Sequence, residues 1–163
     1  MKASTYKAKD NEANFGEPIE DQIKGGTHIT LELVTKKGDR FCMTKWPQGL
    51  PRHEDPPNAL RFPHGLMIFG ETPEESAARL VKDQLGMAVD NCKIAYMESY
   101  LDDMKHWHIE LGFIVDVSGN PKIPRDAEEI VEFTAEKIPK MTFWSRADFL
   151  EFLDEHLPEL IAS

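Results

Sequence analysis

Within the segment 27–35, apolar Ile29, Leu31 and Leu33 alternate with Thr30 and Glu32, which lie on the opposite face. A period of two is typical of a β-strand with one apolar face and one wetter face. The turn-forming residues 36–39 follow, and a second apolar segment, 40–46, comes directly after them. Together these segments predict a β-hairpin near the start of the folded region.

The segment after this hairpin carries strong local signals for a helix. Thr72 is a good N-cap residue, Pro73 suits the first helical position, and Glu75 completes a capping box. Gly86 suits the C-terminal end, where the backbone needs a left-handed conformation. These residues predict a helix that begins after Thr72 and ends at Gly86.

The remaining segments complete a mixed fold. Two apolar segments, 93–101 and 106–117, predict strands joined by the polar turn 102–105, whereas segment 129–140 is ambiguous. Ser145 would cap a last amphipathic helix that ends the chain. Strands on both sides of one central helix predict an α+β fold, with a mixed sheet and helices packed on it.

The length of 163 residues suits one domain of ordinary size. The first 25 residues are polar and lack clear periodicity. We therefore expect a polar tail or lead-in over residues 1–25 and a single domain over residues 26–163.

Charge and composition exclude some classes of function. A formal net charge of -10 repels nucleic-acid backbones, so no nucleic-acid partner is expected. No apolar run approaches the roughly 18 residues of a membrane span, and the N-terminus lacks the apolar centre of a signal peptide. A cytoplasmic location without a membrane partner follows as an expectation. Cys42 and Cys92 favour two buried thiols over a disulfide or a zinc site.

The helix and the loop before it carry a spaced set of residues that belongs to a known signature. The signature places a glycine, a glutamate, an arginine, an apolar residue, a second glycine and a second apolar residue at fixed intervals. Here those places are filled by Gly65, Glu71, Arg79, Val81, Gly86 and Met87. The stretch Gly65–Met87 resembles the motif of the Nudix hydrolase superfamily. The resemblance implies an α/β/α sandwich and hydrolysis of diphosphate-containing, nucleoside-diphosphate-linked substrates with Mg²⁺ or Mn²⁺.

Three helix positions depart from this motif. The family would place glutamates at positions 80, 83 and 84, where this chain has Leu80, Asp83 and Gln84. Mg²⁺ binds best to anionic oxygens, so the loss of two carboxylates would weaken a metal site on this helix. Asp83 remains as a candidate catalytic group and metal ligand. Glu71 is a weaker candidate for the same roles, because the family uses it partly to brace the loop and to pair with Arg79.

Other acids and histidines are candidates to replace the missing groups. Glu128 and Glu129 lie in a predicted loop of the kind that supplies further catalytic acids in the family; a solvated acidic loop is the simpler interpretation. His106, His108 and Glu110 would share one strand face, which suits a transition-metal site or a polar face lining a pocket.

The sequence gives weaker signals for substrate recognition. Arg52, Arg61, His64 and Arg79 are the candidates for contact with phosphate oxygens. Four aromatic residues are candidates for stacking on a base or sugar, although packing would explain them equally: Trp46, Tyr96, Tyr100 and Trp107.

Two hypotheses for the function remain open. The first is a Nudix-type pyrophosphohydrolase with a small phosphorylated ligand, in which the altered motif leaves activity weak or lost. The second is a non-catalytic Nudix-like domain that binds a ligand or a protein partner and needs no cofactor. The family also contains many dimers, so a homodimer is a further expectation.

Overall fold

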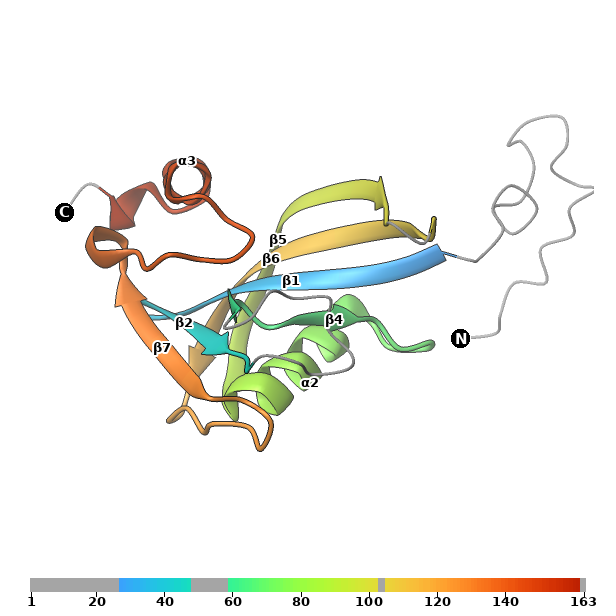
Figure 1. The fold of residues 1–163 in the computed structure, drawn as a ribbon, viewed down its shortest axis with the longest axis horizontal. Coiled ribbons are helices and arrows are strands. Elements are labelled where there is room, and N and C mark those ends of the chain that lie inside the picture. The colour runs from blue at the N-terminus through green and yellow to red at the C-terminus, as the bar shows by residue number, and fades with distance from the viewer. Residues whose placement is uncertain (1–26, 48–58, 103–104, 162–163) are drawn as a thin grey trace, which may run out of the picture.

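The structure, a computed structural model, describes residues 27–47, 59–102 and 105–161 (Figure 1). The expected lead-in over residues 1–25 and the candidate Arg52 lie outside these ranges. Within them, no helix is both long enough and apolar enough to cross a membrane.

Seven strands form one mixed sheet. Its main path runs β3-β2-β1-β6-β5, with β4 paired to β1 and β7 paired to β2. β1 and β6 are parallel, and the other pairs are antiparallel. The strands are β1 (Thr27–Lys37), β2 (Arg40–Lys45), β3 (Leu60–Arg61), β4 (His64–Leu66), β5 (Ala88–Leu101), β6 (Trp107–Ser118) and β7 (Glu129–Thr134).

Two helices cover opposite faces of this sheet (Figure 1). α2 (Pro73–Leu85) packs Ala77, Val81 and Leu85 against one buried cluster that includes Leu33 of β1. α3 (Arg146–His156) belongs to a second cluster, which includes Phe41, Phe133, Phe149 and Leu153. The expected α+β fold, an α/β/α sandwich with a mixed sheet between helices, is therefore confirmed.

The ends of α2 are those that its sequence predicts. The Thr72 side chain accepts a hydrogen bond from the Glu75 backbone at 3.2 Å, and the Glu75 carboxylate accepts one from the Thr72 backbone at 2.8 Å. Gly86 ends the helix with a φ of 67°, a left-handed conformation that glycine adopts without a steric cost. The capping box fixes where the helix starts relative to the loop that precedes it.

The last predicted helix is shorter than expected. α3 ends at His156, and a short 3-10 turn, η3 (Pro158–Leu160), follows it. Pro158 has no backbone N–H and disfavours helical geometry in Leu157, which explains the break. The ambiguous segment resolves as β7 followed by a second 3-10 turn, η2 (Ala135–Lys137).

The prediction that Glu32 lies on a wetter face of its strand is wrong. β1 is buried on both faces along its middle, and Glu32 is only 8% exposed. Both faces of β1 are covered by helices: Leu33 packs in the cluster of α2, whereas Val34 packs in the cluster of α3. The two cysteines are free thiols, Cys42 buried and Cys92 half-buried, so neither forms a disulfide.

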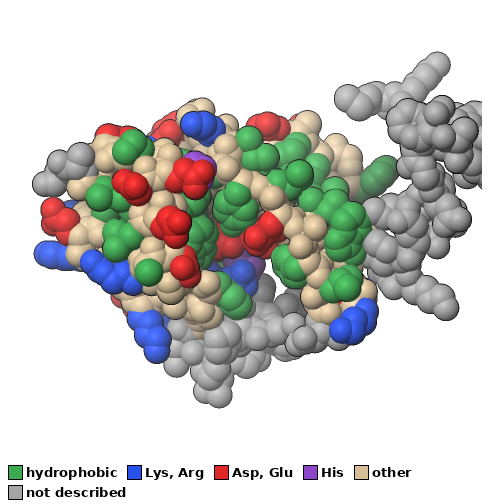
Figure 2. Space-filling model, turned by 90° about the horizontal axis from the view of Figure 1, so that it is seen from above, with side chains coloured by type: hydrophobic (Ala, Val, Ile, Leu, Met, Phe, Trp, Pro, Cys, Tyr) green, Lys and Arg blue, Asp and Glu red, His purple; other side chains and the backbone are tan. Residues whose placement is uncertain are grey.

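α3 does not cover its whole face of the sheet. Figure 2 looks down on this face and shows hydrophobic and acidic side chains gathered around a hollow beside the helix. This hollow is the cavity described below.

Candidate functional site

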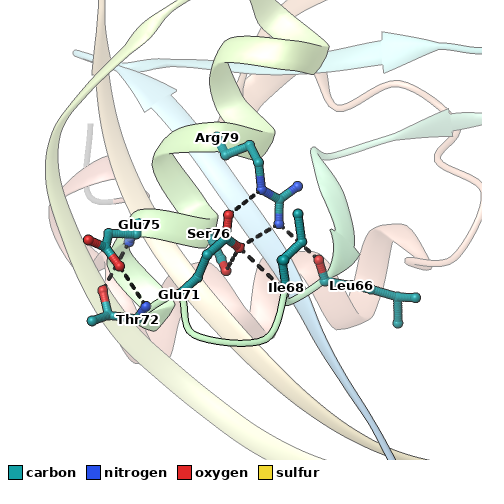
Figure 3. Close-up of polar contacts among 7 residues, drawn as sticks. All are labelled: Leu66, Ile68, Glu71, Thr72, Glu75, Ser76 and Arg79. Atoms are coloured by element: carbon teal, nitrogen blue, oxygen red, sulfur yellow. Dashed lines mark hydrogen bonds and ion pairs between the residues drawn. The ribbon is translucent and has the colours of Figure 1, made fainter. Parts of the chain in front are cut away.

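Glu71, the glutamate of the motif, is held by groups of its own loop and helix (Figure 3). Its Oε1 accepts a hydrogen bond from Arg79 Nε at 2.7 Å, and its Oε2 accepts one from Arg79 Nη2 at 2.8 Å. Oε2 also accepts from the Ser76 hydroxyl and from the Ile68 backbone N–H. The hydrogen bonds from Arg79, and then that from Ser76, lower the pKa of Glu71 to about 2. The carboxylate is thus ionised but already committed to bracing the corner.

The donors of Arg79 are also engaged in hydrogen bonds within the protein. Besides its two bonds to Glu71, its Nη2 donates to the Leu66 backbone carbonyl at 3.0 Å. The hydrogen bond to Glu71 raises the pKa of Arg79 further. The expected pairing of Arg79 with Glu71 is therefore present, and this guanidinium ties α2 to the end of β4.

Leu80 and Gln84 occupy positions where the family motif has glutamates, and both have structural roles here. Leu80 is 5% exposed and lies so close to Gly65 that a Cβ there would come within 2.8 Å of Leu80 Cδ2. Gln84 Nε2 donates to the His64 carbonyl oxygen at 2.6 Å, and Gln84 Oε1 accepts from the His64 N–H at 3.2 Å. Gln84 thus clamps the last turn of α2 to the backbone of β4.

These residues do not fit a magnesium or manganese site. Such ions need several oxygen ligands, preferably anionic ones. The side-chain oxygens of Gln84 and Glu71 already accept hydrogen bonds from the protein. Asp83 is exposed and contributes a single carboxylate. Among the residues that the structure describes, no three His, Cys, Asp or Glu side chains are grouped so that they could hold a metal ion.

A cavity of about 1210 Å³ is lined by residues of β1, β4, β5 and β6, by Phe143 and Trp144 just before α3, and by Arg79 of α2. Its lining includes three of the predicted substrate-binding residues, Arg61, His64 and Arg79. Tyr96 and Tyr100 also line it, whereas Trp46 and Trp107 do not. The cavity is large enough for a small molecule, and its lining mixes polar and apolar side chains.

Two carboxyl groups, those of Glu32 and Glu110, lie near each other in this cavity. The sequence singled out Glu110 as a candidate but not Glu32. Glu32 Oε1 accepts a hydrogen bond from Trp144 Nε1 at 2.8 Å. The Tyr96 hydroxyl lies 3.5 Å from Glu32 Oε2 and 3.2 Å from Glu110 Oε1. Burial, and then the charge of Glu32, raises the pKa of Glu110 to about 7. The Tyr96 ring lies directly over Gly112, where a Cβ would come within 2.0 Å of the ring.

His106 and His108 meet at an aspartate that the sequence did not single out. His106 Nδ1 and His108 Nε2 each lie 3.1 Å from Asp102 Oδ2, and the His106 N–H donates to Asp102 Oδ1 at 2.8 Å. Burial acts to raise the pKa of Asp102, but these hydrogen bonds lower it to about 2. Glu110 contacts Tyr96 instead, so a shared metal role for the two histidines stays a prediction.

Glu128 and Glu129 lie away from this cavity. Both are exposed, and neither is among the residues that line it. Glu128 pairs with Lys45 at 3.2 Å, and Glu129 opens β7 in register with the same lysine. Their catalytic role stays a prediction without a contact to support it, as does that of Asp83, which also does not line the cavity.

No protein-family model matches the sequence, and no curated protein matches it. Solved structures with the same fold do exist. The MutT protein from Methanosarcina mazei Go1 superposes with a TM-score of 0.65 at 16% identity, over 83% of this chain and 99% of that one. A MutT NUDIX hydrolase from Burkholderia pseudomallei gives 0.60 at 15% identity, over 77% and 95%.

A NUDIX hydrolase from Nitrosomonas europaea gives a TM-score of 0.55 at 15% identity, over 68% of this chain and 74% of that one. The Nudix-like fold implied by the Gly65–Met87 stretch is therefore confirmed. Identities this low show the fold alone and leave the activity open.

Proposed function

We propose that this protein is a member of the Nudix superfamily that binds a small molecule in the cavity beside α3. We further propose that hydrolysis of diphosphate-containing substrates at the motif is weak or lost. The observation that carries this proposal is the clamp between Gln84 and the His64 backbone. It uses both polar atoms of a side chain that stands where the family has a metal-binding carboxylate.

The neighbouring positions support the same conclusion. Leu80 packs on Gly65 and offers no oxygen, while Glu71 is held by Arg79 and by the Ser76 hydroxyl. Freeing Glu71 for a metal would leave the Arg79 guanidinium without its carboxylate partner. The motif therefore stabilises the corner between β4 and α2, whereas the cavity supplies the space for a ligand.

Metal-dependent hydrolysis is the second candidate, because solved structures that share the fold are named as hydrolases. In that case Asp83 would provide a ligand for Mg²⁺ or Mn²⁺, with help from Glu71. A phosphorylated ligand, a cytoplasmic location and a homodimer stay predictions under either function.

A phosphate-release assay separates the two functions. The full chain would be incubated with Mg²⁺ or Mn²⁺ and with ADP-ribose, ATP and dinucleoside polyphosphates as probes. We expect the wild-type protein to match an enzyme-free blank. Metal-dependent turnover far above the blank that disappears in the Asp83→Asn variant would overturn the proposal in favour of the hydrolase. Ala78→Glu, an exposed change on the same helix, serves as the control.

A further inference from the structure

β5 forms one edge of the sheet. It pairs with β6 on one side, and no other strand that the structure describes pairs with its other side. Its 14 residues make it much longer than a typical strand of about 5–6 residues. Ile94, Met97 and Leu101 on this strand are 53%, 69% and 61% exposed. A long edge strand with exposed apolar side chains is a template for pairing with another strand.

A β-bulge interrupts the middle of β5. Ile94 lies opposite Phe113 of β6 and Tyr96 lies opposite Gly112, so Ala95 is an extra residue between them. Side chains alternate between the two faces of a strand, and an extra residue shifts that alternation by one position. A regular strand would therefore match the faces of β5 on only one side of Ala95. A strand with the same bulge at the same place matches them on both sides.

Two exposed apolar side chains flank the bulge on the α2 face of the sheet. Residues directly opposite each other in a strand pair share one face. Ile94 and Met97 lie opposite Phe113 and Leu111, which pack in the cluster of α2. Ile94 and Met97 therefore lie on the same face although an odd number of positions separates them.

Two exposed side chains of opposite charge flank the bulge on the α3 face. Lys93 lies opposite Ile114, which packs in the cluster of α3. Glu98 lies opposite Glu110, which shares its face of β6 with Ile114. Both Lys93 and Glu98 are exposed. The outer edge of β5 thus carries a cation before the bulge and an anion after it, on one face.

These two pairs make β5 complementary to a second copy of itself. We consider an antiparallel copy whose two-fold axis passes between Ala95 and Tyr96. Lys93 of each copy then lies opposite Glu98 of the other, on the α3 face. Ile94 of each copy lies opposite Met97 of the other, on the α2 face. Opposite charges and apolar side chains in such directly opposed positions stabilise a strand pair.

We propose that two copies of this protein associate through β5 in this register, so that their two sheets become one continuous sheet. The contact is isologous, because each copy offers the same surface to the other. The two bulges meet at the axis, which explains how a bulged edge can still pair. Glu98 also lines the cavity, so the second copy brings its Lys93 to the wall of the first copy's cavity.

Analytical ultracentrifugation of the full chain tests the ion pairs of this interface. We expect a reversible dimer in the wild-type protein. Lys93→Glu places like charges opposite each other twice and should weaken the dimer roughly tenfold or more. The double exchange Lys93→Glu/Glu98→Lys restores both pairs in reversed order and should restore the dimer. Lys137→Glu, an exposed change in η2, serves as the control, and thermal unfolding checks that each variant is folded.

Ser99→Cys tests the register. Because Lys93 lies opposite Glu98, position 99 of one copy lies opposite Cys92 of the other. Opposed positions of an antiparallel pair are within reach of a disulfide, whereas positions 92 and 99 of a single extended strand are too far apart. Under an oxidant we expect Ser99→Cys to form a covalent dimer and Cys92→Ser/Ser99→Cys to form none.

The proposal is overturned by a wild-type protein that stays monomeric up to about 0.1 mM. It is also overturned by a dimer that Lys93→Glu weakens no more than Lys137→Glu does, or that the double exchange does not restore. A covalent dimer that forms equally well without Cys92 would show that the register is wrong. These outcomes leave phosphate release and ligand binding untouched, so the proposed function stands or falls separately.

Discussion

The Gln84→Glu substitution gives the sharpest expectation, because it restores the family's carboxylate and breaks this protein's clamp. The amide of Gln84 donates to the His64 carbonyl at 2.6 Å. A carboxylate in its place would face that carbonyl oxygen with a lone pair instead of a proton.

The cost of this change follows from the lost hydrogen bond. A typical hydrogen bond contributes about 0.5–1.5 kcal/mol, and a buried acceptor left without a partner costs about 1–3 kcal/mol. Because Gln84 and His64 are half-buried, the lower part of these ranges applies. We expect Gln84→Glu to reduce the free energy of unfolding by about 1 kcal/mol at neutral pH.

The cost should depend on pH with a defined sign. The carbonyl contact favours the protonated form of the new carboxyl, which can donate as the amide does, so its pKa is raised in the folded state. Between the unfolded-state pKa of about 4.3 and the raised folded-state pKa, the folded protein therefore binds more protons. Stability relative to wild type falls as pH rises through this window and is largely regained near pH 4.

Urea unfolding of wild type and variant at both pH values measures this difference. Ala78→Glu adds the same charge at an exposed position of α2 and should stay within about 0.5 kcal/mol of wild type. A Gln84→Glu cost no larger than that of this control at neutral pH, or a cost unchanged near pH 4, would show that the amide does not hold this turn of α2.

Three further substitutions test neighbouring parts of the structure by urea unfolding. Gly112→Ala would place a Cβ 2.0 Å from the Tyr96 ring and should cost about 1–3 kcal/mol through overpacking; an unchanged midpoint would contradict that contact. Thr72→Ala removes the N-cap of α2 and should cost about 1 kcal/mol, and a neutral result would refute the cap. Glu71→Gln should destabilise at neutral pH, and because the folded pKa of Glu71 is lowered to about 2, its difference from wild type should close as pH falls from about 4 toward 2. A difference that persists in acid would show that the charge of Glu71 is not what Arg79 requires.

The sequence predicts the elements of this fold that depend on local interactions. The capping box at Thr72 and the left-handed Gly86 act within a few residues of their helix, so their positions follow from spacing alone. The hairpin of β1 and β2 is local in the same sense. Pro158 predicts the end of α3 before it. The apolar period continues past this proline, however, and predicts a longer helix than the structure has.

The candidate site is only partly predictable, because it depends on strand pairing between distant segments. β1 and β6 pair in parallel, in a register that sets Thr30 opposite Glu110 and Glu32 opposite Gly112. Neither the pairing nor its register can be derived from the alternation of apolar residues within each strand. Burial of Glu32 and its approach to Glu110 therefore appear only once the sheet is assembled.

Manganese binding at α2 is the most direct test of the proposal that the motif no longer holds a metal ion. The paramagnetic ion broadens NMR signals close to it, so stoichiometric Mn²⁺ added to the full chain would report on the amides of residues 80–84. We expect no selective broadening there in the wild-type protein, because Gln84 and Glu71 keep their protein partners. Selective broadening at residues 80–84 that Asp83→Asn removes would show that the helix still holds a metal ion.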